Sequence, residues 1–543
     1  MSSPDDYPTG TKLMLPVLAL IVTIFLVALD MSIVATAIPR ITREFNSLDD
    51  IGWYGSAFFL TISSFAQSWG KAYTYFPLKW VIITAICIFE IGSLICGVAQ
   101  DSRTLIIGRA ICGAGGAGVT NGCYIIIAFI AKPEKRPAYT GVLGAVYGLA
   151  SVAGPLVGGA FTTDVSWRWC FYINLPIGGF SLLILLLFFK TPATAIPKPA
   201  TLREKLLLMD PLGVLLVTCS LVCLLLAVQW GGITRPWGSS EVIGCLVGFV
   251  VILIAFAGTQ WWQGEKAMAV PRLLLQRDTI FLSLFNFFLA GSYFTFVYYL
   301  PIYFQSVGDF SAAASAVRSL PLIVGSSVFG IVAGAALTVF GYFHIFLWIG
   351  SALCAAAGGI LYTLSINLST AKYVCGQLLF GIGSGLCLQV PVMAGQAFSK
   401  PEDTASITAI LLFFQTLGGT IFVSVAQSVF TNRLIAKLLS LSTAYNTSEI
   451  ISVGADDLRS HFSGVQLRDI LDSYIVGLRA TWIMGLVCAG VAFLSSFGSK
   501  VRTMKQPAPS ITDENGKDAD GEILTAATSD EKSQKDGVRI TTA

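Results

Sequence analysis

The sequence contains few charged residues and almost no histidine. Asp, Glu, Lys and Arg together make up 12% of the 543 residues, whereas globular proteins typically contain about 25%. The only histidines are His344 and His461, and nearly all of the 12 cysteines lie inside apolar stretches. Only Cys219 and Cys223 have the spacing of one helical face. Since a metal site needs several converging ligands, we expect no metal and no other cofactor, and we interpret the cysteines as small hydrophobic residues.

Sequence signatures of ATP-driven pumps and of hydrolases are absent as well. The chain has no GxxxxGK[ST] loop, so an ATP-driven pump would lack its phosphate-binding site. It has no HExxH or GxSxG motif either, which argues against an enzyme. The net charge of +3 reflects basic loops and does not indicate nucleic-acid binding.

Long hydrophobic runs take the place of these features. Hydrophobic residues make up 55% of the chain, and a helix of about 18 or more apolar residues is long enough to cross a bilayer. We therefore predict an all-α polytopic membrane protein. Its fourteen predicted transmembrane helices lie near 13–38, 51–69, 80–99, 104–130, 138–161, 171–189, 211–229, 241–262, 279–304, 317–340, 344–364, 372–397, 405–430 and 478–498.

The short connections predict the orientation of these spans, because basic residues gather in cytoplasmic loops. Alternate connections are basic, which places both termini in the cytoplasm and the long 431–477 connection outside. Residues 1–12 are polar and no cleavage site follows, so the first span is expected to act as the insertion signal. The sequon at Asn446 is then a predicted glycosylation site. The basic residues in the connections predicted to be cytoplasmic are Lys71, Lys79, Lys132, Lys135, Arg136, Lys190, Lys198, Arg203, Lys205, Lys266, Arg272 and Arg277.

Two basic linkers divide the spans into two sets of six and an insert of two. The loops 70–77 and 334–341 each start with glycine and turn at a breaker seven residues later, as in transporters built from repeats. The predicted parts are a cytoplasmic N-terminus 1–12, a first six-helix bundle 13–189, linkers with two extra helices 190–278, a second bundle 279–498, and a disordered cytoplasmic tail 499–543 rich in polar residues.

The run 150–180 predicts a site of close helix packing. Small residues that include Gly154, Gly158 and Gly159, with a proline at Pro155, let a helix bend and let a neighbouring backbone approach closely. A WRW turn at 167–169 follows, in which we expect the arginine to lie between two indole rings as an interfacial anchor.

Four stretches resemble those of a known family. LDMSIVATAIP at 29–39 is similar to a first-helix LDxTIVxxALP signature, and GRAICGAGGA at 108–117 is similar to an RxxQG motif, with cysteine where glutamine is usual. GPLVGG at 154–159, followed by WRWCFYINLPIGG, is similar to an antiporter motif. GKAYTYFPLK at 70–79 is similar to a GxLaDrxGrk loop, with Thr74 in place of its aspartate.

On these residues the chain resembles the major facilitator superfamily, in particular its fourteen-span drug:proton antiporter group and the fungal toxin efflux pumps within it. The resemblance covers residues 13 to about 430. It implies a major facilitator fold with two six-helix bundles plus two extra central helices, and a proton-coupled export activity.

Three ionisable residues lie deep inside predicted spans. Such groups are costly in a bilayer, at about 2.5 to 3.5 kcal/mol on insertion scales, and are functional candidates for that reason. Asp30, Glu90 and Arg109 have comparable depths. An Asp30–Arg109 pair would keep the carboxylate ionised, and its separation during transport would favour proton uptake. The alternatives are a static pair that only fixes helix packing and, for Glu90, a packing role against a polar neighbour.

Polar residues among aromatic ones predict the substrate cavity. Apolar walls with few polar groups suit a bulky amphipathic molecule. Ordinary aromatic packing and interhelical hydrogen bonding are the alternatives for each side chain. The predicted cavity residues are Asn286, Tyr293, Tyr298, Gln305, Gln389 and Gln415.

We therefore predict a proton-coupled exporter of hydrophobic small molecules, such as a fungal secondary metabolite or toxin, or drugs. The expected partners are this substrate, protons and the lipid bilayer, with no nucleic acid, and we expect a monomer. The plasma membrane is the predicted location, with the vacuolar membrane as the alternative. A siderophore or organic-ion carrier remains open, as does a transporter-like receptor or scaffold.

Overall fold

The computed structural model of the chain describes residues 7–45, 47, 50–192, 195–441, 445, 447, 450, 453 and 458–504. These residues belong to one structural unit, Met1–Met504, and a second unit comprises Lys505–Ala543. The predicted glycosylation site Asn446 and the predicted tail from residue 505 onward lie outside the described residues. Within the described ranges the chain is helical, and its only β-type contact is a single bridge between Gly231 and Arg235.

The N-terminal half of the unit consists of long helices joined by short turns. They are α1 (Thr11–Phe45), α2 (Ile51–Tyr75), α3 (Leu78–Val98), α4 (Ser102–Ile130), α5 (Arg136–Ala160) and α7 (Asn174–Phe188). A single turn, η3 (Pro133–Lys135), precedes α5, while a π-type turn, η4 (Phe161–Val165), and a short helix, α6 (Trp169–Tyr172), separate α5 from α7. A second short helix, α8 (Leu202–Leu208), follows this half.

Two extra helices and a second set of long helices complete the unit. The extra pair is α9 (Pro211–Trp230) and α10 (Ser240–Gln263), followed by η5 (Gly264–Lys266) and α11 (Pro271–Leu274). The second set consists of α12 (Arg277–Ser306), α13 (Ala312–Arg318), α14 (Leu320–Phe340), α15 (Phe343–Tyr362), α16 (Thr370–Cys387), α17 (Val390–Phe398), α18 (Thr404–Leu441), α20 (Leu458–His461) and α21 (Gly464–Ser496).

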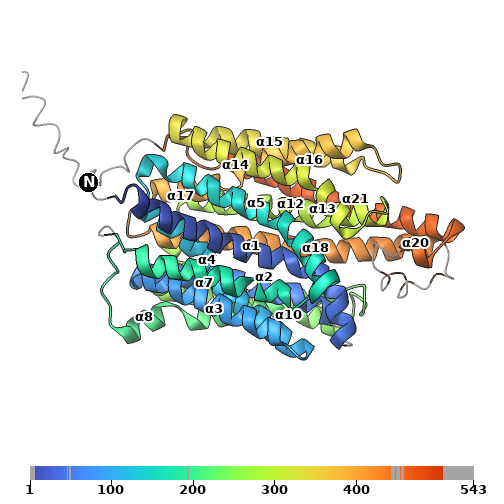
Figure 1. Ribbon diagram of the computed structural model, residues 1–543, viewed down its shortest axis with the longest axis horizontal. Helices are drawn as coiled ribbons and strands as arrows, with labels where there is room; N and C mark the ends of the chain where they lie inside the picture. The colour runs from blue at the N-terminus through green and yellow to red at the C-terminus, as the bar shows by residue number, and fades with distance from the viewer. Residues whose placement is uncertain are drawn as a thin grey trace, which may run out of the picture. The chain divides into compact units, whose positions relative to one another are not determined.

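The long helices pack side by side as two bundles. In the first, α4 packs on α2 and α3 while α1 packs on α5; in the second, α12 packs on α18 and α21 while α16 packs on α14 and α15. The bundles meet along α5 with α14 and along α2 with α18, and α9 contacts both α2 and α18. Figure 1 shows α15 and α16 at one edge of the unit and α3 at the other. The predicted fold, two bundles plus two extra helices, is confirmed.

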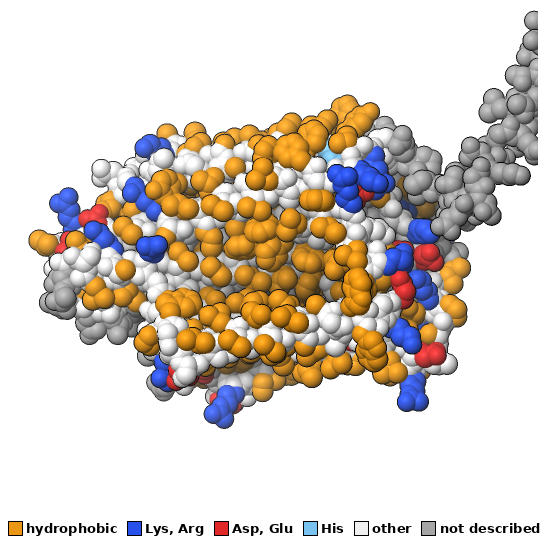
Figure 2. All heavy atoms as spheres, turned by 180° about the vertical axis from the view of Figure 1, so that it is seen from behind, with side chains coloured by type: hydrophobic (Ala, Val, Ile, Leu, Met, Phe, Trp, Pro, Cys, Tyr) orange, Lys and Arg blue, Asp and Glu red, His pale blue; other side chains and the backbone are white. Residues whose placement is uncertain are grey.

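The surface of the unit fits a bilayer. Figure 2 shows a broad hydrophobic band on the face drawn, with most of the charged side chains gathered at its two ends. The side chains of α10 are the clearest case, because Ile243, Val247, Val250 and Ile254 are all at least 48% exposed. Exposure of this kind is costly in water and is normal for a helix face in lipid.

Thirteen helices among the described residues are long and apolar enough to cross a membrane. The predicted second span corresponds to α2, which is outside that set although its 25 residues run through the bundle. Its composition gives the reason, since Ser63, Ser64, Gln67 and Ser68 are all buried in the protein interior. A helix surrounded by other helices does not need an apolar surface all around.

Two other spans differ from their predicted bounds. The predicted span 372–397 is divided into α16 and α17, with Pro391 in the first turn of α17, where a missing backbone N–H is tolerated. The helices α18 and α21 extend to Leu441 and back to Gly464, so the connection between them is shorter than the predicted 431–477. Leu438, Ile470 and other side chains of these extensions form a small hydrophobic cluster of their own.

Candidate functional site

Arg109 is positioned by close packing of α4 between α2 and α3. A Cβ atom added at Gly113 would lie 2.4 Å from the carbonyl oxygen of Phe58, and one added at Gly115 would lie 2.3 Å from the backbone nitrogen of Phe89. Only glycine allows both approaches. The arginine one turn earlier on α4 is therefore held at a fixed place among the helices.

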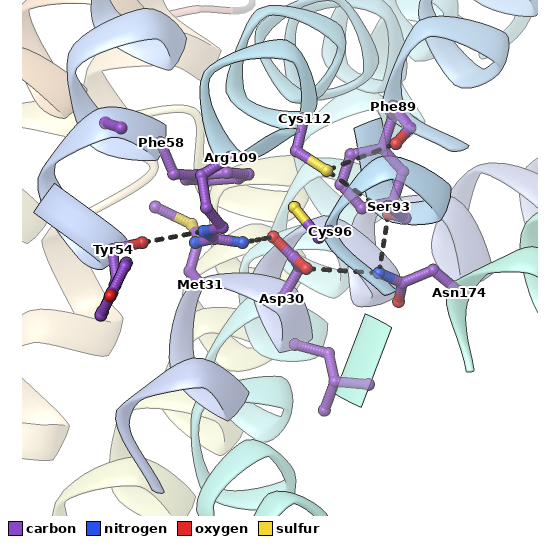
Figure 3. A network of polar contacts seen from close by, with 12 residues as sticks. Asp30, Met31, Tyr54, Phe58, Phe89, Ser93, Cys96, Arg109, Cys112 and Asn174 are labelled. Carbon is purple, nitrogen blue, oxygen red and sulfur yellow. Dashed lines mark hydrogen bonds and ion pairs between the residues drawn. The ribbon is translucent and has the colours of Figure 1, made fainter. Parts of the chain in front are cut away.

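The guanidinium of Arg109 forms an ion pair with Asp30 of α1. Nη1 of Arg109 donates to Oδ2 of Asp30, and Nε donates to the backbone oxygen of Tyr54 at 3.0 Å (Figure 3). The ring centroid of Phe58 lies 4.5 Å from the guanidinium carbon. The pair is sealed from solvent, with side-chain exposures of 0% for Asp30 and 1% for Arg109. Removal of one partner would leave a buried charge unpaired, which is strongly destabilising.

Neutral polar groups extend this pair on its other side. Asn174 of α7 donates from Nδ2 to Oδ1 of Asp30 at 3.3 Å and to the hydroxyl of Ser93 at 3.1 Å (Figure 3). The Ser93 hydroxyl also lies 3.4 Å from the sulfur of Cys112, the residue at the usual glutamine position. Our sequence analysis missed Asn174 and Ser93. The signal available was the asparagine inside the otherwise apolar span 171–189.

Glu90 does not join this network by a hydrogen bond. It lies on α3 one turn before Ser93, and both of its carboxyl oxygens are buried without a hydrogen-bond partner among the described residues. The carboxyl packs against Gly178 of α7, where an added Cβ would lie 1.7 Å from Oε1. Glu90 therefore contacts α7 through Gly178, whereas Ser93 contacts the same helix through Asn174.

The predicted packing site on α5 is occupied by α1. A Cβ added at Gly154 would lie 2.0 Å from the hydroxyl of Ser32 and 2.9 Å from the backbone nitrogen of Ile33, and one at Gly158 would lie 2.7 Å from the oxygen of Ile33. The Ser32 hydroxyl also donates to the α5 backbone at 3.2 Å. Gly159 takes no part, because no atom lies within 4 Å of a Cβ placed there. Pro155 lies inside α5.

The WRW turn fixes the end of α1. Trp167 Nε1 donates to Glu44 at 2.7 Å, and Arg168 donates to Glu44 at 2.8 Å. These bonds, that of Trp167 first, lower the pKa of the Glu44 carboxyl below its usual value. Arg168 lies over Trp167 at 4.4 Å, whereas Trp169 packs on Phe161 and Tyr172 instead. The expected arginine between two indoles is therefore wrong, since only one ring contacts it.

The segment 70–79, predicted as a loop, contains the end of α2 and the start of α3, and it connects to the other half through the insert. The hydroxyl of Thr74, at the usual aspartate position, bonds within its own helix. Lys71 donates to the backbone oxygen of Glu265 at 2.8 Å. Arg272 forms ion pairs with Glu265 at 2.7 Å and with Asp403 at 3.1 Å. Charged contacts thus run from α2 to the start of α18 without an acidic residue in the loop.

A cavity lies between the two bundles and has an empty volume of about 720 Å³, part of it open to solvent. No charged side chain lines it. The hydroxyl of Thr120 and Oε1 of Gln389 lie in its wall, buried and without a hydrogen-bond partner among the described residues. The lining residues are Ile62, Thr120, Tyr124, Gly144, Tyr147, Gly148, Tyr293, Phe294, Ser326, Gly330, Gly385, Leu388, Gln389, Leu412, Gln415 and Thr416.

Three of the six predicted cavity residues line this space, namely Tyr293, Gln389 and Gln415. The other three do not. Asn286 is buried and donates to the α18 backbone at 3.1 Å, Tyr298 packs on an α2 phenylalanine with ring centroids 6.4 Å apart, and Gln305 lies in the last turn of α12. Sequence reasoning missed the tyrosines of α4 and α5 because it considered aromatic residues of one span only.

No group of three or more His, Cys, Asp and Glu residues in the described part of the chain could hold a metal ion. The Asp30–Arg109 pair and Glu90 lie within the first bundle, and none of the three lines the cavity. The arrangement thus combines a buried carboxylate, a group that can exchange a proton, with an uncharged space between the two bundles.

Comparisons with known proteins agree on one family. The family model described as Major Facilitator Superfamily matches residues 20–423. The chain is 46% identical to the MFS-type transporter GME11371 of Pestalotiopsis microspora over 90% of both chains. It is 42% identical to the MFS-type efflux pump MFS1 of Trichophyton rubrum over 92% of this chain and 93% of that protein. It is 44% identical to the probable efflux pump gsfJ of Penicillium aethiopicum over 91% of this chain and 88% of that protein.

Solved structures show the same fold at low sequence identity. The human organic anion transporter MFSD10 has a TM-score of 0.58 and 13% identity over 90% of this chain and all of its own. The proton:xylose symporter XylE has a TM-score of 0.55 and 13% identity over 88% of this chain and 94% of its own.

Proposed function

Since the chain belongs to the major facilitator superfamily, we propose that this multi-pass membrane transporter exports uncharged hydrophobic small molecules in exchange for protons. Export is supported by relatives named efflux pumps that are 42% and 44% identical over about nine-tenths of the chain. Fungal secondary metabolites, toxins and drugs are the substrates we propose.

The cavity supports an uncharged substrate. Its wall contains tyrosine rings, a phenylalanine, amides and hydroxyls but no ionisable acid or base other than tyrosine. A charged ligand would have to lose its hydration there without a counter-charge, which is costly. A siderophore or organic-ion carrier would need such a counter-charge, so this alternative is disfavoured. The unpartnered oxygen of Gln389 favours ligands that donate a hydrogen bond.

The buried Asp30–Arg109 pair is the single observation that carries the proposed proton exchange. Arg109 is tied to α2 through Tyr54, whereas Asp30 belongs to α1, which packs mainly on α5. A shift of α1 relative to α4 would separate the charges. A carboxylate left alone in an apolar interior is costly and would take up a proton. When the pair forms again, the proton would be released.

Glu90 is a second proton-binding residue in this proposal. Glu90 lies on α3 one helical turn before Ser93, and both of its carboxyl oxygens are unpartnered among the described residues. Ser93 is linked through Asn174 to Asp30. A proton could pass between the two carboxyls with Ser93 and Asn174 between them. The alternative role for Glu90 is packing against Gly178.

We propose that the protein acts as a monomer in the plasma membrane, with the vacuolar membrane as the alternative location. A receptor or scaffold is disfavoured because it has no need of a charged pair deep between spans.

Tritiated estradiol tests this function. It is a neutral hydrophobic molecule with a phenol whose pKa is about 10, so its charge does not change between pH 5 and 8. Liposomes with an acidic lumen and the purified protein should accumulate estradiol, and estradiol should raise the luminal pH. Liposomes without protein provide the blank. Accumulation that is independent of the pH difference would contradict proton exchange.

A further inference from the structure

Helix α5 contacts both the cavity and the turn of α1 that carries Asp30. Its inner part lines the cavity with Gly144, Tyr147 and Gly148. Its outer part, from residue 150 onward, packs against α1 through Gly154 and Gly158. One helix therefore contacts both the proposed substrate site and the helix that carries the proposed proton site.

Tyr147 contacts the residue next to Asp30. Its hydroxyl donates to the sulfur of Met31 at 2.6 Å, and Met31 is the residue after Asp30 on α1, as Figure 3 shows. Met31 is itself buried, with 8% of its surface exposed. The next residue, Ser32, donates to the α5 backbone. The turn that presents Asp30 to Arg109 is thus held on its other side by α5.

We propose that Tyr147 couples the occupancy of the cavity to the protonation of Asp30, an inference that rests on the proposed function. A ligand in the cavity contacts the Tyr147 ring, and displacement of the ring breaks the bond to Met31. The α1 turn then moves relative to Arg109, which α4 and α2 hold in place. Substrate and proton come to influence one another through this one contact, as thermodynamic linkage requires of two coupled sites.

A purely structural role for Tyr147 predicts a different result. If the ring only fills space, loss of the hydroxyl changes affinity or stability but not the pH dependence of binding. If the hydroxyl transmits the change, the pH dependence itself is reduced. For one proton that competes with the substrate, the apparent Kd rises by up to about tenfold for each unit by which the pH falls.

The experiment measures binding of tritiated estradiol to the full-length protein in lipid nanodiscs from pH 5 to pH 8. The variants are Tyr147→Phe and Met31→Leu, each of which removes one side of the contact and keeps most of the side-chain volume. Tyr139→Phe is the matched control, because Tyr139 lies on the same helix but not in the cavity wall. Met31→Leu keeps the test valid if Tyr147→Phe binds no ligand, because Met31 is not in the wall.

The coupling role predicts that the Kd of wild-type protein and Tyr139→Phe changes by about tenfold per pH unit over part of the range, and that of Met31→Leu and Tyr147→Phe by less than about threefold. An unchanged slope in Met31→Leu, or an equal loss of slope in Tyr139→Phe, would overturn it. A wild-type protein whose estradiol binding is absent or independent of pH would instead refute the proposed function itself.

Discussion

Replacement of Gly154 tests the packing of α1 on α5. A Cβ at this position would lie 2.0 Å from the hydroxyl and 2.8 Å from the Cβ of Ser32, and 2.9 Å from the backbone nitrogen of Ile33. The last contact is with backbone, so no rotamer change relieves it and the two helices must separate. Gly154→Leu adds three more carbons to this overlap. Overpacking of this kind costs about 1 to 3 kcal/mol. A cost of about 2 kcal/mol shifts the equilibrium between packed and separated helices by about 30-fold.

Gly159→Leu provides the control on the same helix, because nothing lies within 4 Å of the added Cβ. Both variants should insert into the membrane, since both add apolar volume. Estradiol transport by Gly154→Leu should fall far more than its amount in the membrane, while Gly159→Leu should stay near wild type. Gly154→Ala adds only the Cβ and should also reduce transport. Ser32→Gly in the same protein removes the side chain that this Cβ meets and should restore part of the transport, but not all, because the contact with the Ile33 backbone remains. Equal transport by Gly154→Leu and Gly159→Leu at equal amounts would refute the close-packing account.

Three further predictions concern the end of α1, the connection between α18 and α21, and the cavity. The pKa of Glu44 is lowered in the folded protein, so its hydrogen bonds stabilise the fold above the usual glutamate pKa of 4.5 and are lost as the pH falls through the lowered value. In thermal unfolding in detergent, the melting temperature of wild type should therefore be higher than that of Glu44→Gln at pH 7. The difference between the two melting temperatures should vanish in acid. Asn446→Gln should remove the glycan if one is attached, and mapping that finds this connection in the cytoplasm would contradict the orientation. Gln389→Leu should weaken binding of estradiol more than that of its 3-methyl ether, and equal losses would argue against a hydrogen bond from the phenol.

The ion pair could be predicted from the sequence because charge inside an apolar span has few explanations. Asp30 and Arg109 stand out against their surroundings, and their contact follows from comparable depths. Asn174 and Ser93 do not stand out, since neutral polar residues are common in membrane helices and their partners depend on helix rotation. Only the packed structure shows that Asn174 reaches Asp30.

The cavity was predicted less completely for the same physical reason. Gln389 lies where α16 ends and α17 begins, a break that Pro391 indicates but that does not reveal which way the side chain points. Tyr293 lines the cavity, whereas Tyr298, five residues later on α12, packs on α2 instead. Side chains five residues apart point in directions that differ by about 140° around the helix axis. A residue on a cavity-lining helix therefore does not necessarily line the cavity.

The length of α2 is a further case. Hydrophobicity measures how well a helix suits lipid, and α2 is surrounded by protein on much of its surface. Its buried serines, such as Ser63, which lies 3.1 Å from Thr420 of α18, reflect contact with the other bundle. Composition predicted this span only over 51–69, whereas α2 runs from Ile51 to Tyr75.

The most direct test of the proposed exchange is purified Asp30→Asn in liposomes with an acidic lumen, compared with wild type and Glu90→Gln. Asparagine keeps the size and the hydrogen-bonding ability of the side chain but cannot carry a proton. The account predicts that Asp30→Asn still equilibrates tritiated estradiol down its gradient but neither concentrates it nor raises the luminal pH, while wild type does both. If Asp30→Asn concentrated estradiol on an imposed pH difference as wild type does, Asp30 would not be the coupling residue, and loss of accumulation in Glu90→Gln alone would assign that role to Glu90.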